Sequence, residues 1–170
     1  MRSHLVTPSP LGELTLVAED GDLVGCLMSV PDRGPGDDTL GAPADGESAD
    51  PVLAAAAAQL GEYFAGERTV FDLPLAPRGD DFQRRVWALL CEIPYGETRS
   101  YGQLARALGD VNLSQAVGWA NGRNPISIIV PCHRVIGSDG SLVGYAGGLD
   151  RKRFLLSLEE PPAEQAHRLF

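Results

Sequence analysis

Hydrophobic and polar residues alternate over much of the first 30 positions, as they do in a half-buried β-strand. Apolar residues recur at Leu14, at Leu16 and through 23–28, and the turn-prone residues 19–22 separate them. We therefore predict a β-hairpin. Residues 31–51 are rich in Gly, Pro, Asp and Ser and offer little to bury, so a mobile loop is expected there.

The spacing of apolar residues then predicts two helices and one more strand. Residues 52–65, which are rich in Ala and precede Gly66, should form a helix. Residues 69–75 are typical of a strand. Apolar residues within 82–91 lie three to four positions apart, which indicates a helix with one buried face.

A chain of 170 residues with 44% hydrophobic content suits one good core or two small ones. The Pro, Gly and Asp residues of 77–81 are typical of a boundary between domains. We place an α/β domain, a small sheet plus a helix, at 1–78 and a mainly helical domain at 79–160. Residues 161–170 form a tail that we expect to be loosely held.

Two short helices are predicted within the second domain. Ser100 and Gln103 have the spacing of a capping box, which starts a helix ending near Gly109. After a turn, a second helix should begin with Ser114 or Asn112 as its cap. This arrangement indicates a helix-turn-helix, although helical hairpins with a glycine turn are common in proteins that never meet DNA.

Small residues on the second helix favour nucleic-acid recognition over plain packing. Ala116, Gly118 and Ala120 would let the helix backbone lie close against a nucleic-acid groove.

The net charge of −9 argues at first against such a partner, because phosphate binding depends on Lys and Arg. The charge is unevenly distributed, however: residues 1–81 hold 4 basic and 15 acidic residues, whereas 82–170 hold 10 and 8. Only the second half has a charge balance that is compatible with binding DNA. On charge alone, an acidic half that merely provides solubility is an equally good interpretation.

The three cysteines, Cys26, Cys91 and Cys132, are too few and too irregularly spaced for a disulfide framework, which fits a reducing compartment. With no CxxC and only three histidines, no metal site is expected. No apolar run approaches the roughly 20 residues that cross a bilayer. We expect a cytoplasmic protein without a membrane partner.

Cys132 has the surroundings of a nucleophile. The apolar residues 126–130 should form a buried extended segment that delivers Cys132 to a defined place, and His133 follows directly. An adjacent imidazole can take the thiol proton, directly or through water, and a third group must orient it. The candidate is Glu159, near the end of a helix that Phe154, Leu155 and Leu158 attach to the core. The alternative is an inert, buried cysteine, an interpretation that suits Cys26 and Cys91 better.

Several motifs in the second domain carry a family resemblance. The segments PCHRVI at 131–136, GYAGGL at 144–149 and LLSLE at 155–159 resemble the O6-alkylguanine-DNA alkyltransferases, also called methylated-DNA–protein-cysteine methyltransferases. The match extends upstream through FQRRVW at 82–87, IPYGET at 93–98, SY at 100–101, AVG at 116–118 and GRNP at 122–125. The first domain looks like the looser N-terminal domain of that family.

The resemblance implies a ribonuclease H-like small sheet plus helix, followed by a mainly α domain of winged helix-turn-helix type. It implies that Cys132 accepts the alkyl group, that His133 acts on it through water, and that Glu159 orients His133. Asn124 would brace the active-site turn. Tyr101 would help rotate the nucleotide and protonate the guanine ring.

The resemblance also implies a DNA-binding surface. The second helix, with Gln115, Ala116 and Gly118, would bind the minor groove of duplex DNA, and the damaged base would be flipped out at a cost of a few kcal/mol. Ser138 and Tyr145 would line the base pocket. The expected protein is a monomer in solution that could assemble cooperatively on DNA.

The reaction that the resemblance implies is direct reversal of DNA damage. An alkyl group moves from O6 of guanine, and less efficiently from O4 of thymine, to Cys132. The product is a thioether, which has no carbonyl for water to attack, so each molecule works once and needs no cofactor. Two alternatives remain open: a lesion sensor that only binds, as in relatives that lack the cysteine, and a cysteine hydrolase, which leaves the helix-turn-helix unexplained.

Gln115 stands where the family usually has an arginine that fills the gap left by the flipped base. Glutamine brings no charge, so we predict that Gln115→Arg strengthens DNA binding and steepens its salt dependence. Affinities measured across a salt series would test this. Unchanged affinity and unchanged repair rate would contradict it.

Overall fold

The computed structural model describes residues 2–28, 42–43, 50–140 and 148–160. The chain divides into two compact units: one comprises Met1–Arg78 together with Pro125–Ile129, the other Gly79–Asn124 together with Val130–Phe170. The grouping of Pro125–Ile129 with the first unit had no signal in the sequence. The expected tail at 161–170, and all of the expected loop at 31–51 except residues 42–43 and 50–51, lie outside the described residues.

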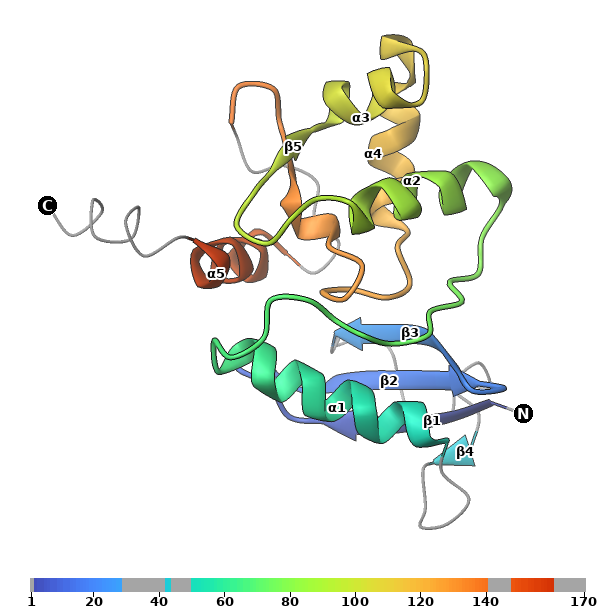
Figure 1. Ribbon diagram of the computed structural model, residues 1–170. Helices are drawn as coiled ribbons and strands as arrows, with labels where there is room; N and C mark the ends of the chain where they lie inside the picture. The colour runs from blue at the N-terminus through green and yellow to red at the C-terminus, as the bar shows by residue number, and fades with distance from the viewer. Residues whose placement is uncertain (1, 29–41, 44–49, 141–147, 161–170) are drawn as a thin grey trace, which may run out of the picture. The chain divides into compact units, whose positions relative to one another are not determined.

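The first unit contains a four-stranded sheet in the order β3-β2-β1-β4 (Figure 1). Its strands are β1 (Arg2–Thr7), β2 (Leu14–Glu19), β3 (Asp22–Met28) and the short β4 (Ala42–Pro43). β2 and β3 form the predicted hairpin. Both residues of its turn, Asp20 and Gly21, have positive φ, as a tight two-residue hairpin turn requires.

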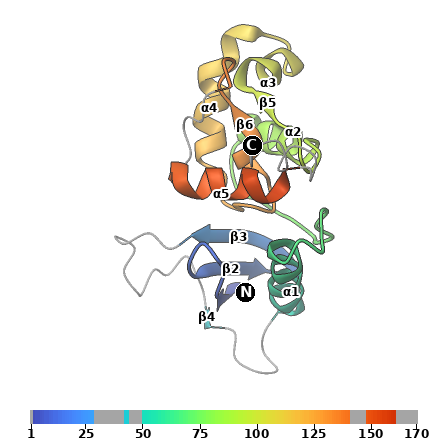
Figure 2. The same cartoon turned by 90° about the vertical axis from the view of Figure 1, so that its left-hand side faces the viewer.

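Helix α1 (Pro51–Phe64) packs against this sheet and completes the α/β unit (Figures 1 and 2). The Asp50 side chain accepts a hydrogen bond from the backbone N–H of Val52 and so caps the helix. The core of the unit is made by apolar side chains of the sheet and of one helix face, among them Leu14, Leu16, Leu23, Leu53, Ala56, Leu60 and Tyr63.

The strand expected at 69–75 is wrong. The segment contributes only one isolated bridge, between Leu75 and Leu23. Pro74 and Pro77 have no backbone N–H, so this stretch cannot form a continuous ladder of hydrogen bonds.

The second unit is mainly helical, as predicted. Its first helix, α2 (Asp81–Cys91), begins with a capping box between Asp80 and Gln83. The predicted pair follows as α3 (Tyr101–Ala107), capped by Ser100 and Gln103, and α4 (Ser114–Gly122). The expected side-chain cap of α4 is wrong: Leu113 occupies the N-cap position, because a turn of 3₁₀ helix, Val111–Leu113, leads directly into the helix.

The remaining elements of the second unit surround the segment that holds Cys132. The two-residue strands β5 (Arg99–Ser100) and β6 (Val135–Ile136) pair in parallel. Helix α5 (Leu149–Glu159) buries Lys152, Leu155 and Glu159, which lie three and four residues apart. Phe154, expected in the core, is 39% exposed because it lies off this face.

The segment before Cys132 is a pair of tight turns, which corrects the expected extended segment. Ile126 bridges to Cys26, but Ile128 has a φ of 73° and the N–H of Ile129 donates to the carbonyl of Ser127 at 2.8 Å. This is a γ-turn with a positive central φ, a rare and strained conformation for a β-branched residue. A second γ-turn is centred on Pro131 (φ −82°, ψ 66°), with the N–H of Cys132 donating to Val130 at 2.8 Å. Apolar composition alone could not distinguish these turns from a strand.

No helix in the part of the chain that the structure describes is long and apolar enough to cross a membrane.

The capping box of α3 yields a test of local stability. Ser100→Ala should lower the free energy of unfolding of the second unit by about 1 kcal/mol, because it leaves the backbone N–H of Gln103 without its acceptor. Both tryptophans lie in this unit, so urea titration followed by tryptophan fluorescence reports on it. Ser100→Thr keeps the acceptor oxygen and should lose much less; an equal loss would exclude the cap as the cause.

Candidate active site

Cys132 begins a single turn of 3₁₀ helix, Cys132–Arg134, and is 5% exposed. Two asparagines from the α4 region hold this turn through its backbone. Asn124 donates to the carbonyl of Val130 at 2.8 Å, and Asn121 donates to the carbonyl of Cys132 at 3.3 Å. Asn124 was expected from the resemblance to brace this turn, whereas Asn121 was not anticipated.

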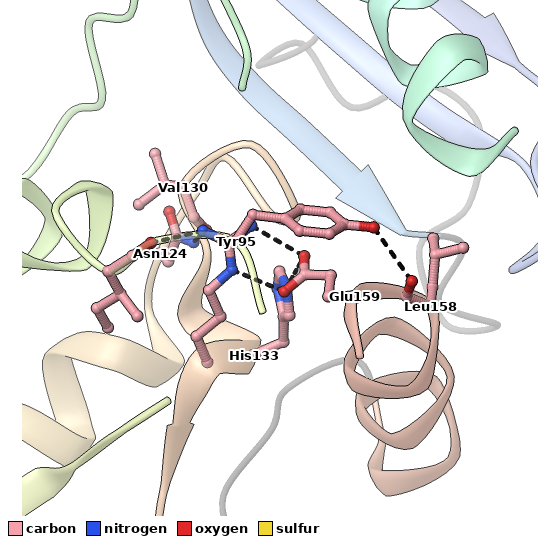
Figure 3. Close-up of polar contacts among 8 residues, drawn as sticks. Tyr95, Asn124, Val130, His133, Leu158 and Glu159 are labelled. Atoms are coloured by element: carbon pink, nitrogen blue, oxygen red, sulfur yellow. Dashed lines mark hydrogen bonds and ion pairs between the residues drawn. The ribbon is translucent and has the colours of Figure 1, made fainter. Parts of the chain in front are cut away.

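His133 and Glu159 meet in the interior of the second unit, where both side chains are buried (Figure 3). Nε2 of His133 lies 2.8 Å from Oε2 of Glu159. An ionised carboxylate only accepts hydrogen bonds, so Nε2 carries the proton of the neutral ring and Nδ1 carries the lone pair. Nδ1 is buried and has no hydrogen-bond partner among the described residues. The ring can therefore act as a base through Nδ1.

Arg134 binds the same carboxylate from the other side. Its Nε donates to Oε1 of Glu159 at 2.7 Å and one terminal nitrogen donates to Oε2 at 3.0 Å. Its other terminal nitrogen donates to the carbonyl of Ile93 at 2.6 Å. This two-point geometry is the strong form of an arginine–carboxylate pair. Sequence inspection treated Arg134 only as part of the PCHRVI segment and assigned it no role.

These contacts determine the protonation of the pair. Burial raises the pKa of Glu159, but hydrogen bonds from His133 and Arg134 outweigh it and bring the pKa to about 2. Burial lowers the pKa of His133 and exceeds the opposing effect of Glu159, while the charges of Arg134 and Lys152 lower it further. At neutral pH the site thus contains a carboxylate and a neutral imidazole whose Nδ1 carries the lone pair.

Lys152, on the buried face of α5, is a second charged residue that sequence reasoning missed. Its side chain is fully buried, and Nζ donates to the carbonyl of Val135 at 2.5 Å. Burial lowers the pKa of Lys152, and the charge of Cys132 opposes that shift. A positive charge on Lys152 and a negative charge on Cys132 therefore stabilise each other. Its signal was the spacing 152, 155, 159, which places it on the face of α5 that carries Glu159.

Tyr95 attaches the end of α5 to the site. Its hydroxyl donates to the carbonyl of Leu158 at 3.1 Å, next to Glu159 (Figure 3). The Arg134 guanidinium lies 5.8 Å from its ring centre. Tyr95 therefore links the end of α5 to the neighbourhood of Arg134.

Tyr101 is the first residue of α3. Burial raises the pKa of its phenol, the charge of Cys132 raises it further, and a hydrogen bond with Asn121 lowers it. A Cβ on Gly118 of α4 would lie 3.6 Å from the Tyr101 ring. That distance is an ordinary van der Waals contact, so the ring lies against α4 at Gly118. The five residues expected to be catalytic, Cys132, His133, Glu159, Asn124 and Tyr101, all belong to the second unit.

The residues expected to bind DNA are distributed differently. Gln115 and Ala116 are exposed on α4, and Ser138 is exposed after β6. Tyr145 lies outside the described residues. On α4, Trp119 is 56% exposed, with the Arg123 guanidinium 4.0 Å from its ring centre, and the sequence had not singled it out. Gln115 and Trp119 are four residues apart and so share one side of α4, and Arg123 follows at the C-cap of the helix.

The other two cysteines differ in their environments. Cys26 is fully buried in β3, in agreement with an inert packing residue. Cys91 was also expected to pack, but it is exposed at the last residue of α2.

Comparison with known proteins identifies both halves of the chain. Residues 81–161 match the family described as 6-O-methylguanine DNA methyltransferase, DNA binding domain, and residues 3–77 match its ribonuclease-like domain. The methylated-DNA–protein-cysteine methyltransferase of Mycolicibacterium paratuberculosis is 48% identical over 171 residues, covering 100% of this chain and 99% of that protein. The corresponding protein of Mycobacterium tuberculosis is 49% identical and covers 95% and 94%.

Solved structures agree. A crystal structure of the Mycobacterium tuberculosis O6-methylguanine methyltransferase superimposes with a TM-score of 0.84 at 48% identity, covering 98% of both chains. A structure of the protein from the same organism in complex with DNA gives a TM-score of 0.83 at 50% identity and covers 92% of each chain. The chain belongs to the 6-O-methylguanine DNA methyltransferase family, and the predicted fold class of both domains is confirmed.

The buried ion pair yields a second stability test. Arg134→Met should lower the free energy of unfolding of the second unit by about 3 to 5 kcal/mol, because it leaves the Glu159 charge buried with only His133 beside it. Urea titration followed by tryptophan fluorescence would measure the loss.

Two further variants serve as controls. Arg153→Met removes an arginine from the same region, but its pair with Asp150 is exposed, so stability should barely change. The double variant Arg134→Met, Glu159→Leu should recover part of the loss, because no charge is left unpaired. A double variant no more stable than Arg134→Met would contradict the electrostatic explanation.

Proposed function

We propose that this chain removes a methyl or other small alkyl group from O6 of guanine in DNA by transferring it to its own Cys132, once per molecule. Membership of the 6-O-methylguanine DNA methyltransferase family supports the activity. The observation that carries the residue assignment is the buried pair beside Cys132: an ionised Glu159 that binds Nε2 of His133 and leaves Nδ1 as the base.

The reaction begins with transfer of the Cys132 proton to Nδ1 of His133, directly or through water. Glu159 then binds a cationic ring, and the ammonium group of Lys152 stabilises the thiolate. The sulfur attacks the alkyl carbon in line, the S–C bond forms as the C–O6 bond breaks, and the electron pair moves onto the guanine. The Tyr101 hydroxyl donates a proton to the guanine ring, and the proton that His133 took from Cys132 returns to the Tyr101 phenolate, so that no proton is gained or lost overall.

The product accounts for the single turnover. A thioether has no electrophilic carbonyl, so a Cys-His-Glu site cannot hydrolyse it, and no cofactor is needed for the forward step. O4-alkylthymine should react by the same displacement but less efficiently.

For DNA recognition we propose that α4 binds the minor groove and that the damaged base leaves the helix to reach Cys132. Gln115 and Ala116 are exposed on α4, and Gln115 would occupy the gap left by the base. Ser138 and Tyr145 would contact the flipped base. We further propose a cytoplasmic monomer that assembles cooperatively on DNA.

Mass spectrometry tests the transfer directly. After incubation with duplex DNA containing one O6-methylguanine, the protein mass should rise by one CH₂, and peptide mapping should place the methyl group on Cys132. With excess DNA, methyl removal should stop at one equivalent per protein. Continued removal would exclude a single-turnover mechanism, and DNA binding without any mass change would favour a lesion sensor.

Two cysteine variants make the assignment specific. Cys132→Ser should abolish transfer because a hydroxyl is a far weaker nucleophile at neutral pH. Cys91→Ser removes the exposed thiol of α2 and should transfer as fast as the natural chain. Methylation of Cys91, or loss of transfer in its serine variant, would contradict the proposal.

A further inference from the structure

Helix α4 carries an exposed tryptophan that the reaction described above does not use. Trp119 is 56% exposed, whereas the other tryptophan, Trp87, is 2% exposed and donates to the carbonyl of Ala120 at 2.9 Å. The indole has a large apolar surface, and leaving it in water forgoes the stabilisation that burial would give. A single exposed apolar side chain is ordinary, so the neighbours of Trp119 decide whether it has a role.

The neighbour that covers the indole is Arg123. Its guanidinium carbon lies 4.0 Å from the centre of the Trp119 ring, which is the geometry of a cation–π contact. Arg123 occupies the C-cap of α4 and is exposed. In the part of the chain that the structure describes, its side chain forms no ion pair with a carboxylate. The stack therefore presents a flat cation beside a flat apolar ring, and the protein does not neutralise the cation.

The rest of this side of α4 leaves the stacked pair accessible. The other residues three or four positions from Trp119 are exposed and either small or uncharged: Gln115, Ala116 and Gly122. A Cβ on Gly122 would meet nothing within 4 Å, so packing within the protein does not require glycine there. Helix α4 contains no acidic residue. The indole thus stands above short neighbours, and no charge on the helix opposes an anionic partner.

A partner for this pair must offer an anion and an apolar surface side by side. The backbone of duplex DNA does so at every nucleotide, because each phosphate adjoins a deoxyribose whose C–H groups are apolar. Backbone contacts of this kind hold a protein in register on the duplex without reading its sequence. The location also fits, because Trp119 lies one helical turn, about 6 Å along the axis, from Gln115, the residue proposed to fill the gap left by the flipped base.

We propose that Trp119 and Arg123 form a second DNA contact of α4, in which the guanidinium binds a backbone phosphate and the indole packs on the adjoining sugar. The stack orders both side chains before binding, so less conformational entropy is lost in the complex. Helix α4 itself contains no basic residue, so Arg123 at its C-cap supplies the cation. The proposal rests on the proposed function in one respect, that α4 is the helix that meets DNA.

The first test measures how well acrylamide quenches tryptophan fluorescence. Trp87 is buried, so the quencher acts mainly on Trp119 in the free protein. Saturating undamaged duplex should lower the quenching constant about twofold, because the sugar covers the indole. Trp119→Phe leaves only Trp87 and should show no such change. Duplex binding with an unchanged quenching constant would overturn the proposal.

The second test measures the affinity for a labelled undamaged duplex across a salt series. Arg123→Gln should reduce the slope of log affinity against log salt by about 0.9, the effect of one phosphate contact. Trp119→Ala should weaken binding about fivefold, because the apolar contact and the support of the guanidinium are both lost. Alanine favours a helix more than tryptophan does, so α4 itself is not weakened. An unchanged slope in the first variant, or an unchanged affinity in the second, would overturn the proposal.

Three further variants make this test specific. The double variant Trp119→Ala, Arg123→Gln should lose less affinity than the product of the two single losses, because the pair acts as one unit. Losses that multiply fully would contradict the stacked contact. Phe154→Ala removes an exposed ring from α5, and Arg78→Gln removes an exposed arginine from the first unit. Both controls should bind the duplex as the natural chain does.

The remaining outcomes separate this proposal from the proposed function. A quenching constant that falls with rising protein concentration, without DNA, would identify a second copy of the chain as the partner of Trp119 and overturn the proposal. Normal duplex binding by both single variants, in a chain that methylates Cys132, would overturn this proposal alone. Failure of the natural chain to bind any duplex would instead overturn the proposed function.

Discussion

A buried carboxylate shared by an arginine and a histidine is the interaction on which the rest of the second unit depends. Glu159 is almost completely removed from water, and an isolated charge in that position would be prohibitively costly. Arg134 binds both of its oxygens, which keeps it ionised and leaves it able to accept the proton of Nε2 of His133. Because Glu159 holds the proton on Nε2, the nitrogen that is left to act as a base is Nδ1.

The fold brings these groups together from segments that are distant in the chain. His133 and Arg134 come from one turn of 3₁₀ helix, and Glu159 comes from the end of α5. The backbone that enters this turn is held by two γ-turns, of which the one at Ile128 is strained, and by amide contacts from Asn121 and Asn124. Strain of this kind persists only where surrounding contacts determine the conformation, which is common beside reactive groups.

Helix α4 has two sides with different consequences for function. Gln115 and Trp119 are exposed on one side, while Val117 and Asn121 are buried on the other. The helix that we expect to meet DNA therefore also touches the turn of the nucleophile through Asn121. Tyr101 packs against the same helix at Gly118, so the expected proton donor and the nucleophile share one support.

Local features of the chain were readable without a structure, because they depend on neighbours in sequence. The hairpin turn at 19–22, the capping box of Ser100 and Gln103, and the succession of Cys132 and His133 are all of this kind, and the motifs around them sufficed to name the family. Glu159 was the candidate partner of His133 even before the resemblance, from its place near the end of a helix attached to the core, although 26 positions separate the two residues.

Only the tertiary structure could assign Arg134 to Glu159, bury Lys152 against the carbonyl of Val135 and direct Asn121 to the carbonyl of Cys132. In each case a polar side chain is buried and its partner is set by packing between distant segments, whereas composition predicts such residues at the surface. The tight turns at 126–131 were not predicted for a related reason. An apolar run indicates that a segment is buried, but it does not determine the conformation of the backbone.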